Sequence, residues 1–591
     1  MPVTEGNIEV INTGKFLDTT EVTQTDGLEV QREVVVIGDP STLANYAEVT
    51  SSDPTISDIG LVTRSLSYGV RDNNSVKMLQ LTGENHLEVA IHDPVLPFGA
   101  LHVENLTPVF QVDALYGINA TEVLQTTGLA FESNPPTPGA NSGANTGTNN
   151  LLTCATGTTA FSFASMQSRA RLKYRPGQGV LGRFSALWSS PAASSIVVAG
   201  MGNPESGVFF GYNGTSFGIL YSTGGVRCIQ TLTITTRTTT GGTVIFRLNG
   251  LDYTVTIPAG ATTQRTAYDI SLQTFPGWSV ASVGSTVVFL ASSVGVRAGA
   301  FTLTNGTAVG TVGAFAQTLA GAAATDTWVP QASWNGDKLN GTGPSGVTLD
   351  PSKGNVFEIG IQYLGFGAVT FRVETIASDG NNATPTLVHT LNIPNSRTTV
   401  SFSMPSFPFT MAAYSAGSTT NVSVSVGSFA GFIEGNQVIT GPRFTYPTED
   451  ASFVGSAAGT YYPLTTIRNG LVFNGRANQC PVTILSVGAA SADATPTTLF
   501  LIKNATLLGP VNFTTWSTSS VTFVDTSATT CTFSDNNQIV ATLPIGNGGA
   551  DFESFDNEIT LQPGERITVA ARGVTGTVTY FLSTLDTQED N

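Results

Sequence analysis

Trp334, Asn335 and Asp337 place a flat apolar ring beside an amide and a carboxylate within one short segment. Carbohydrate sites use this combination, because an aromatic ring packs on the C–H face of a sugar while polar groups hydrogen-bond its hydroxyls. Trp328 precedes the segment, and the Gly- and Ser-containing run Gly341–Gly346 follows it. We therefore predict a carbohydrate site at Trp334, Asn335 and Asp337. The alternative is that the tryptophans anchor the core or the loop.

A basic stripe is formed by Arg169, Arg171, Lys173 and Arg175. Because side chains alternate along a strand, residues at this spacing line one face of it. The formal net charge of −17 disfavours nucleic acid as a partner, since phosphate backbones need basic surfaces. We predict that the stripe is a protein interface, for which an acidic N-terminal region of a neighbouring subunit is a candidate partner. A solvated strand face is the alternative.

Glu358 and Glu374 are the carboxylates best placed for sugar hydrolysis, because both fall on the polar faces of predicted strands. A glycosidase needs two such groups roughly 5–10 Å apart across a sugar cleft. The Glu-x-Asp-x-Glu pattern of lectin-fold glycosidases is absent, so we interpret both glutamates as solvated charges. His389 lies in another predicted strand, with no serine–acid arrangement near it in sequence. We predict no catalytic residues and no enzymatic activity.

Two further groups have metal-ligand chemistry. The acidic cluster of Asp551, Glu553, Asp556 and Glu558 carries the hard oxygen atoms that calcium prefers, although a charged loop is the default interpretation. The histidines His86, His92 and His102 fall at even positions, but their spacing matches no standard zinc site. We predict no metal and no cofactor, and calcium at Asp551–Glu558 stays an open alternative.

The elements that must position these residues are predicted to be β-strands. Apolar residues alternate with polar ones in several runs, as a half-buried strand requires. The clearest run has Phe357, Ile359 and Ile361 on one face, and the run Val369–Val373 repeats the pattern after a turn at Gly365–Gly367. Asn249-Gly250 predicts a tight hairpin, because both turn residues need positive φ.

Composition supports an all-β protein. Charged residues make up only 11% of the chain, hydrophobic residues 40%, and glycine is abundant with 63 residues. No sustained helical periodicity with caps is present, so helices should be few and short. The four cysteines are far apart without a CxxC pair, which indicates a reducing cytosol rather than a disulfide framework. No apolar run reaches the roughly 18–20 residues of a membrane helix, so no membrane insertion is expected.

The order of these patterns predicts several β-sandwich or jelly-roll domains in series. Residues 1–132 hold 19 acidic and 5 basic residues, and the Pro/Gly/Asn-rich run 133–150 has no large apolar side chain to bury. The predicted parts are an acidic N-terminal β region (1–132), a hinge (133–150), a split central sandwich (151–229 plus 326–441), an inserted β-sandwich (230–325) and a C-terminal jelly-roll-like domain (442–591).

The middle of the chain resembles virion structural proteins of tailed bacteriophages and some large DNA viruses, of the fibre, appendage or tail-associated kind. The segments that carry the resemblance are Lys173–Gly179, Gly211–Gly218, Asp337–Gly346, Phe357–Gly367, Pro405–Phe409 and, nearer the N-terminus, Val36–Pro40 and Leu106–Gly117. The central pattern is also similar to the concanavalin-like lectin fold. The resemblance implies a virion component, assembled in the host cytoplasm, with an N-terminal anchor and outward β domains.

On this basis we predict a head or tail fibre or appendage of a bacteriophage particle that attaches by its N-terminal region and contacts the host surface. Its expected partners are other virion proteins of capsid, neck or tail, copies of itself as a homotrimer, and a host-surface glycan. Two alternatives stay open. A cement or decoration protein would bind only other virion proteins, and a glycan-degrading appendage would need a carboxylate pair in a cleft.

Overall fold

The computed structural model describes most of the chain after residue 105 and three short stretches before it. The described residues are 8–10, 15–23, 29–35, 106–129, 141–376, 383–435, 441–448, 459–491, 496–546, 548–555, 559–573 and 581–589. The chain divides into two units, residues 1–95 and residues 96–591. In the first unit, β1 (Ile8–Val10), β2 (Lys15–Thr23) and β3 (Glu29–Val35) form an antiparallel sheet.

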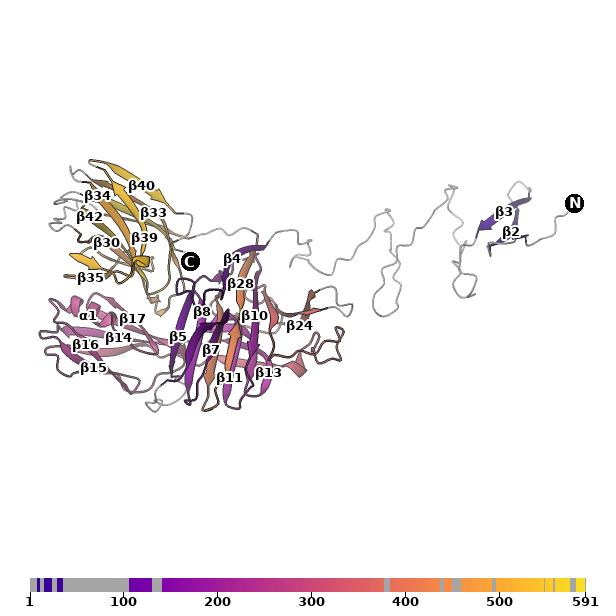
Figure 1. Cartoon of the computed structure of the whole chain (residues 1–591), viewed down its shortest axis with the longest axis horizontal. Coiled ribbons are helices and arrows are strands. Elements are labelled where there is room, and N and C mark those ends of the chain that lie inside the picture. The colour runs from indigo at the N-terminus through magenta and orange to yellow at the C-terminus, as the bar shows by residue number, and fades with distance from the viewer. Residues whose placement is uncertain are drawn as a thin grey trace. The chain divides into compact units, whose positions relative to one another are not determined.

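The second unit consists of antiparallel β-sheets, which confirms the predicted all-β class and sandwich architecture. Three bodies make up this unit: a central sandwich, an insert within it and a C-terminal sandwich (Figure 1). The described part of the chain contains one α-helix and two short 3-10 helices. No helix in that part is long and apolar enough to span a membrane.

The central sandwich packs a nine-stranded sheet against a seven-stranded one. The first has the order β24 (Ala383–Leu391), β23 (Val369–Ile376), β22 (Asn355–Ile361), β10 (Val180–Trp188), β27 (Ser423–Val426), β7 (Leu151–Ala155), β6 (Ala144–Thr148), with β28 (Ser428–Glu434) on β10 and β4 (Leu106–Asp113) on β28. The second has the order β21 (Thr325–Pro330), β13 (Ser216–Thr223), β12 (Ser206–Asn213), β11 (Ser195–Asn203), β26 (Phe409–Ser415), β8 (Ser162–Ser168), β5 (Val123–Leu129). A short pair, β9 (Leu172–Lys173) with β25 (Ser406–Phe407), lies beside them.

The predicted alternation sets the register of this core. Phe357 and Ile359 of β22 lie directly opposite Val373 and Phe371 of β23, and all four side chains are buried. Aromatic and β-branched residues facing each other across strands stabilise a sheet by about 0.2–1 kcal/mol per pair. Gly365 has a φ of +82° in the turn between the two strands, which glycine adopts without steric cost.

The insert lies between β13 and β21, which are hydrogen-bonded neighbours in the central sandwich. One of its sheets has the order β17 (Trp278–Val283), β18 (Thr286–Val294), β14 (Arg227–Thr236), β20 (Val312–Leu319), and the other has β16 (Leu251–Ile257), β15 (Gly242–Leu248), β19 (Thr302–Asn305). These sheets enclose a core of their own around Phe246, Phe275 and Phe289. The predicted Asn249-Gly250 hairpin joins β15 to β16 with both φ angles positive.

The C-terminal sandwich also has two sheets. Its five-stranded sheet contains β29 (Arg443–Pro447), β43 (Phe581–Glu589), β33 (Val482–Ser491) and β40 (Ala550–Ser554) in that order, with β41 (Thr560–Leu561) on β33. The six-stranded sheet has the order β36 (Thr514–Thr515), β37 (Thr522–Asp525), β30 (Tyr462–Asn469), β42 (Arg566–Gly573), β34 (Thr497–Lys503), β39 (Ile539–Ile545). Smaller elements are β31 (Val472–Phe473), β32 (Arg476–Ala477), β35 (Thr506–Leu508), β38 (Thr530–Thr532) and the 3-10 helix η2 (Asn536–Gln538).

Two predicted boundaries need correction. β4 and β5 fall within residues 1–132, yet they add a strand to each sheet of the central sandwich. β6 falls within the predicted hinge 133–150, yet it pairs with β7. The small residues of β6 suit an edge strand, where backbone pairing rather than side-chain burial stabilises the segment. The central sandwich therefore begins before residue 132, and the hinge prediction fails for residues 144–148.

Candidate functional site

Trp334 lies in the core of the central sandwich and not on its surface. The residue follows the 3-10 helix η1 (Gln331–Ser333) and is only 2% exposed. Its ring packs edge-on against Phe210 and Phe217, with ring centroids 6.1 and 6.3 Å apart. A sugar cannot stack on a ring whose faces are covered by other side chains. The predicted carbohydrate contact at Trp334 is therefore corrected, and its ring anchors the loop.

Asn335 ties this loop to the edge of the neighbouring sheet. Its side chain donates to the carbonyl of Thr390 at 2.8 Å and accepts from the amide of Thr390 at 2.8 Å. Its own amide donates to Nδ1 of His389 at 3.2 Å. Burial lowers the pKa of His389, so the neutral imidazole that can accept this bond is favoured. Asn335 and His389 thus serve as structural partners of each other.

Asp337 organises the turns that follow it. Its carboxylate accepts from the amide of Leu339 at 2.9 Å and from the amide of Ser345 at 2.8 Å. Burial alone would raise the pKa of this 5% exposed carboxyl, but the hydrogen bonds from Ser345 and Leu339 outweigh it and hold the pKa below its ordinary value. The predicted sugar-site residue is a buried anchor for the loop.

A cleft of about 430 Å³ opens beside the same loop. Its walls come from three separate segments: the start of β13, the end of β21 with η1, and the loop that Asp337 anchors. The lining includes Ser216, Phe217, Gln331, Lys338, Asn340 and Leu349. Sequence reasoning predicted a site on this loop but missed these residues. Only the pairing of β13 with β21 brings Ser216 and Phe217 to residues more than a hundred positions away.

The first two residues of the basic stripe contact the C-terminal sandwich of the same chain. Arg169 forms an ion pair with Glu565 at 2.8 Å, and Glu565 also binds Lys503 at 3.0 Å. Arg171 donates to the side-chain carbonyl of Gln479. Leu172, between Arg171 and Lys173, is fully buried, as the predicted alternation requires. The partner expected on a neighbouring subunit is thus corrected for Arg169 and Arg171, whose contacts are intramolecular.

Of the other two residues of the stripe, Lys173 ends a short strand and Arg175 lies beyond it. Lys173 belongs to the two-residue strand β9, opposite Ser406. Arg175 lies in a turn, where its carbonyl accepts from the amide of Gln178 at 3.0 Å. The four basic residues therefore do not form one continuous strand face.

A buried charge network lies where the three bodies meet. Glu205, at the turn between β11 and β12, pairs with Arg227 at the start of the insert. The second carboxylate oxygen of Glu205 accepts from the side-chain Nε2 of Gln479 at 3.4 Å. Because Gln479 also binds Arg171, one glutamine joins two charged residues of the central sandwich to the C-terminal sandwich. Burial, aided by repulsion from Arg227, lowers the pKa of Arg171 to about 10, while Glu205 opposes this shift.

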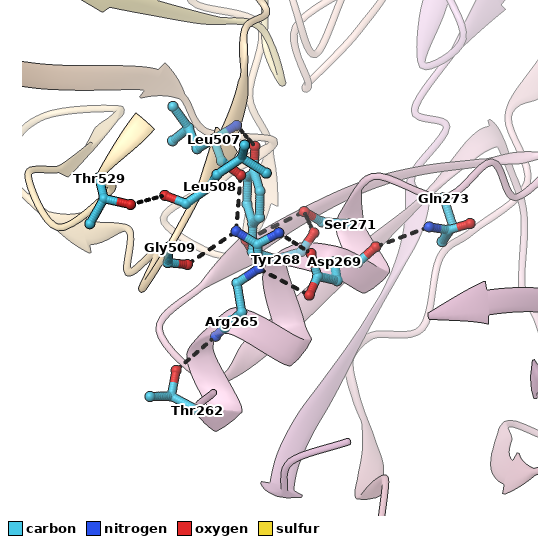
Figure 2. A network of polar contacts seen from close by, with 11 residues as sticks. Thr262, Arg265, Tyr268, Asp269, Ser271, Gln273, Leu507, Leu508, Gly509 and Thr529 are labelled. Atoms are coloured by element: carbon cyan, nitrogen blue, oxygen red, sulfur yellow. Dashed lines mark hydrogen bonds and ion pairs between the residues drawn. The ribbon is translucent and has the colours of Figure 1, made fainter. Parts of the chain in front are cut away.

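The insert docks on the C-terminal sandwich through its helix α1 (Thr263–Ser271) (Figure 2). Thr262 caps the helix by accepting from the amide of Arg265 at 3.0 Å. Asp269 holds the Arg265 guanidinium at 2.7 and 3.0 Å, and the same guanidinium donates to the carbonyls of Leu507 and Gly509 at 2.9 and 3.1 Å. The helix therefore presents a fixed arginine to main-chain acceptors of the other sandwich.

Apolar contacts complete this interface. Tyr268 of α1 is 1% exposed and packs in a cluster with Leu507, Val511 and Phe513, while its hydroxyl accepts from the amide of Leu507 at 2.9 Å. A second arginine, Arg468, donates to the carbonyl of Ser282 in the insert and lies 4.0 Å above the ring of Phe513.

The two candidate carboxylates lie in a ladder of alternating charge. Glu358 of β22 is flanked in register by Arg183 of β10 and Arg372 of β23, and Glu374 forms an ion pair with Arg183. Burial raises the pKa of Glu358, although the two arginines oppose the shift. Arg183 and Arg372 therefore offset part of the burial cost of a charged Glu358, and Arg183 pairs with Glu374 across the strand face.

The predicted metal groups are only partly described. Asp551 and Glu553 share one face of β40, whereas Asp556, Glu558 and the three N-terminal histidines lie outside the described residues. Among the residues that the structure describes, no group of three or more His, Cys, Asp or Glu side chains is placed to hold a metal ion.

Comparisons with known proteins give likenesses among solved structures. No family model and no curated protein matches the chain. Among solved structures, the catalytic domain of an endo-1,3-beta-glucanase (laminarinase) from Thermotoga petrophila RKU-1 is similar at a TM-score of 0.25 and 10% sequence identity. The match covers 56% of this chain and 100% of that one. At this level the likeness carries no argument about activity.

Proposed function

We propose that the chain is a structural component of a bacteriophage particle, a head or tail fibre or appendage that attaches by its N-terminal region and contacts the host surface. Its partners would be other virion proteins of capsid, neck or tail, together with further copies of itself in a trimer. Its place would be the virion, assembled in the host cytoplasm.

The observation that best supports this proposal is the docking of three sandwiches through buried contacts. Glu205, Arg171 and Gln479 link the bodies at one junction, and Tyr268 of the insert completes an apolar cluster of the C-terminal sandwich. Breaking a buried charge pair typically costs about 3–5 kcal/mol, so such contacts oppose independent motion of the bodies. A stiff, multi-body surface module suits a protein that must hold recognition loops at a distance from its attachment point.

The division of the chain into residues 1–95 and 96–591 supports a separate attachment region. The first 132 residues carry most of the net negative charge, and a charged surface favours association with a complementary protein partner. Because β4 begins at Leu106 and belongs to the central sandwich, the attachment region would end before that strand.

A deletion of residues 1–95 tests this proposal. We expect the shortened chain to keep the thermal unfolding of its sandwiches and to be missing from purified particles. The full chain with Arg247→Gln, an exposed substitution in the insert, should be incorporated normally. Incorporation of the shortened chain at the level of the full chain would contradict an N-terminal attachment.

Contact with the host distinguishes this proposal from a cement or decoration protein. We expect the purified full chain to bind host cells, in a pull-down measured against cells of an unrelated bacterium. Equal retention on both cell types would favour the cement or decoration role.

A further inference from the structure

The cleft beside the Asp337 loop has an apolar floor and a polar rim. Phe217 and Leu349 form part of the floor, and each keeps a small exposed remainder of 7% and 8%. Ser216, Gln331, Lys338 and Asn340 supply a hydroxyl, two amides and an ammonium group around it. A ring with one C–H face and several oxygen substituents fits this division of surfaces, because the face packs on the floor while the oxygens meet the rim.

Hydrogen bonds within the chain determine which donors and acceptors of the rim stay available for a ligand. The side-chain Nε2 of Gln331 donates to the carbonyls of Lys338 and Leu339 at 2.8 and 3.1 Å. The side-chain Oε1 of Gln331 therefore stays available as an acceptor. The Oδ1 of Asn340 accepts from the amide and hydroxyl of Thr342 at 3.1 and 2.7 Å, which leaves its Nδ2 as a donor. Ser216 accepts from the indole N–H of Trp328 at 3.4 Å, so its own O–H can donate.

Lys338 gives the cleft a positive charge in an acidic protein. The side chain is exposed, and the ion pairs found in the described parts of the chain do not include it. Together with the Asn340 and Ser216 donors, this ammonium favours an anionic oxygen group on the ligand, since charge-assisted hydrogen bonds are about twice as strong as neutral ones.

The rim is held in place before any ligand arrives. Asp337 fixes the amides of Leu339 and Ser345, and the amide of Leu349 donates to the carbonyl of Leu339 at 2.9 Å. A preformed site avoids part of the ordering cost of binding. The volume of about 430 Å³ lies within the usual range of about 300–1,000 Å³ for ligand sites.

We propose that this cleft binds an acidic sugar, a pyranose ring that carries a carboxylate. Lys338 and Asn340 bind the carboxylate, Gln331 accepts from a ring hydroxyl, and the C–H face lies toward Phe217 and Leu349. The inference rests on the proposed function in one respect, because the source of such a sugar would be a glycan of the host surface.

Isothermal titration of the full chain with methyl β-D-glucuronide and with methyl β-D-glucoside tests the proposal. The two probes differ in the carboxylate, so they isolate the role of the charge. We expect the glucuronide to bind with a Kd of about 1 mM. Lys338→Gln should weaken glucuronide binding by about tenfold and leave the weaker glucoside binding unchanged.

Arg247→Gln is the matched control, because it also removes one positive charge, from an exposed ion pair with Asp252 at 3.3 Å on the insert. We expect it to bind both probes as the natural chain does. Absence of glucuronide binding, equal affinity for both sugars, or equal weakening by the two variants would each overturn the proposal. A chain that binds glucuronide but is missing from particles would contradict the proposed function alone.

Discussion

Asp337 shows how a single side chain can serve a site without touching a ligand. Its carboxylate binds two backbone amides of the loop that carries Lys338 and Asn340. The position of those rim residues therefore depends on a buried charge that a ligand never meets. We regard Asp337 as a positioning residue for the cleft.

Asp337→Asn should destabilise the central sandwich by about 1–2 kcal/mol at pH 7, because one amide loses its carboxylate acceptor. The folded pKa lies below the unfolded value of about 3.9, so this stabilisation is present above that pH and is lost as the pH falls through the folded pKa. Urea denaturation at pH 7 and near pH 3 would measure the difference. A difference in unfolding free energy between the natural chain and Asp337→Asn that does not shrink at the lower pH would contradict this role.

Glu358→Gln should change the folding stability in the opposite direction to Asp337→Asn. Burial raises the folded pKa of Glu358 above its unfolded value, so the charged form becomes a cost as the pH rises through the folded pKa. We expect the variant to be neutral or more stable by less than about 1 kcal/mol at pH 7, because the site is half-buried. Thermal unfolding against Glu374→Gln, which breaks an ion pair, supplies the comparison. A marked loss of stability in Glu358→Gln would show that Arg183 and Arg372 outweigh the burial.

At the scale of elements, helix α1 couples the insert to the C-terminal sandwich. Tyr268→Phe keeps the ring but removes the acceptor for the buried Leu507 amide. An unsatisfied buried donor costs about 1–3 kcal/mol. We expect hydrogen exchange at Leu507 to accelerate while β22 and β23 keep their protection. Unchanged exchange at Leu507 would show that the hydroxyl contributes nothing to the docking.

A substitution at the Glu205 junction should destabilise the docking of the bodies more than Tyr268→Phe does. Glu205→Gln leaves Arg171 and Arg227 buried without their common anion, at a cost of about 3–5 kcal/mol. We expect the three bodies to separate, and small-angle X-ray scattering would record a larger radius of gyration. Glu374→Gln is the control, since its ion pair is 30–46% exposed and worth about 1 kcal/mol or less. An unchanged radius would mean that the apolar contacts suffice.

The sequence was informative where a pattern is local. Period-two alternation identified β22 and β23 with their buried faces, and Asn249-Gly250 identified a hairpin. Helix α1 was not located, because its nine residues are too few for a helical period to stand out. The cleft was missed for another reason: Phe217 and Leu349 meet only after the sheet has formed. Trp334 was misjudged because an aromatic residue beside polar ones has the same sequence signature in a core as in a binding site.

At the scale of the whole molecule, the chain combines an acidic region in its first 132 residues with three sandwiches that dock on one another. In our proposal, the acidic region attaches to the particle and the sandwiches contact the host surface. Trimer formation would multiply the number of clefts and strengthen weak sugar contacts through avidity. Size-exclusion chromatography with mass detection should give three times the 61.5 kDa chain mass, and a stable monomer at high concentration would contradict the trimer.

The central claim is that the chain is part of a virus particle. Cryo-electron microscopy of intact particles, with an antibody fragment bound to the insert, tests it most directly. We predict antibody density on fibres or appendages of the head or tail, at the same positions on every particle. Particles that carry no antibody density, while the full chain stays in the soluble fraction of the infected cells, would contradict the claim.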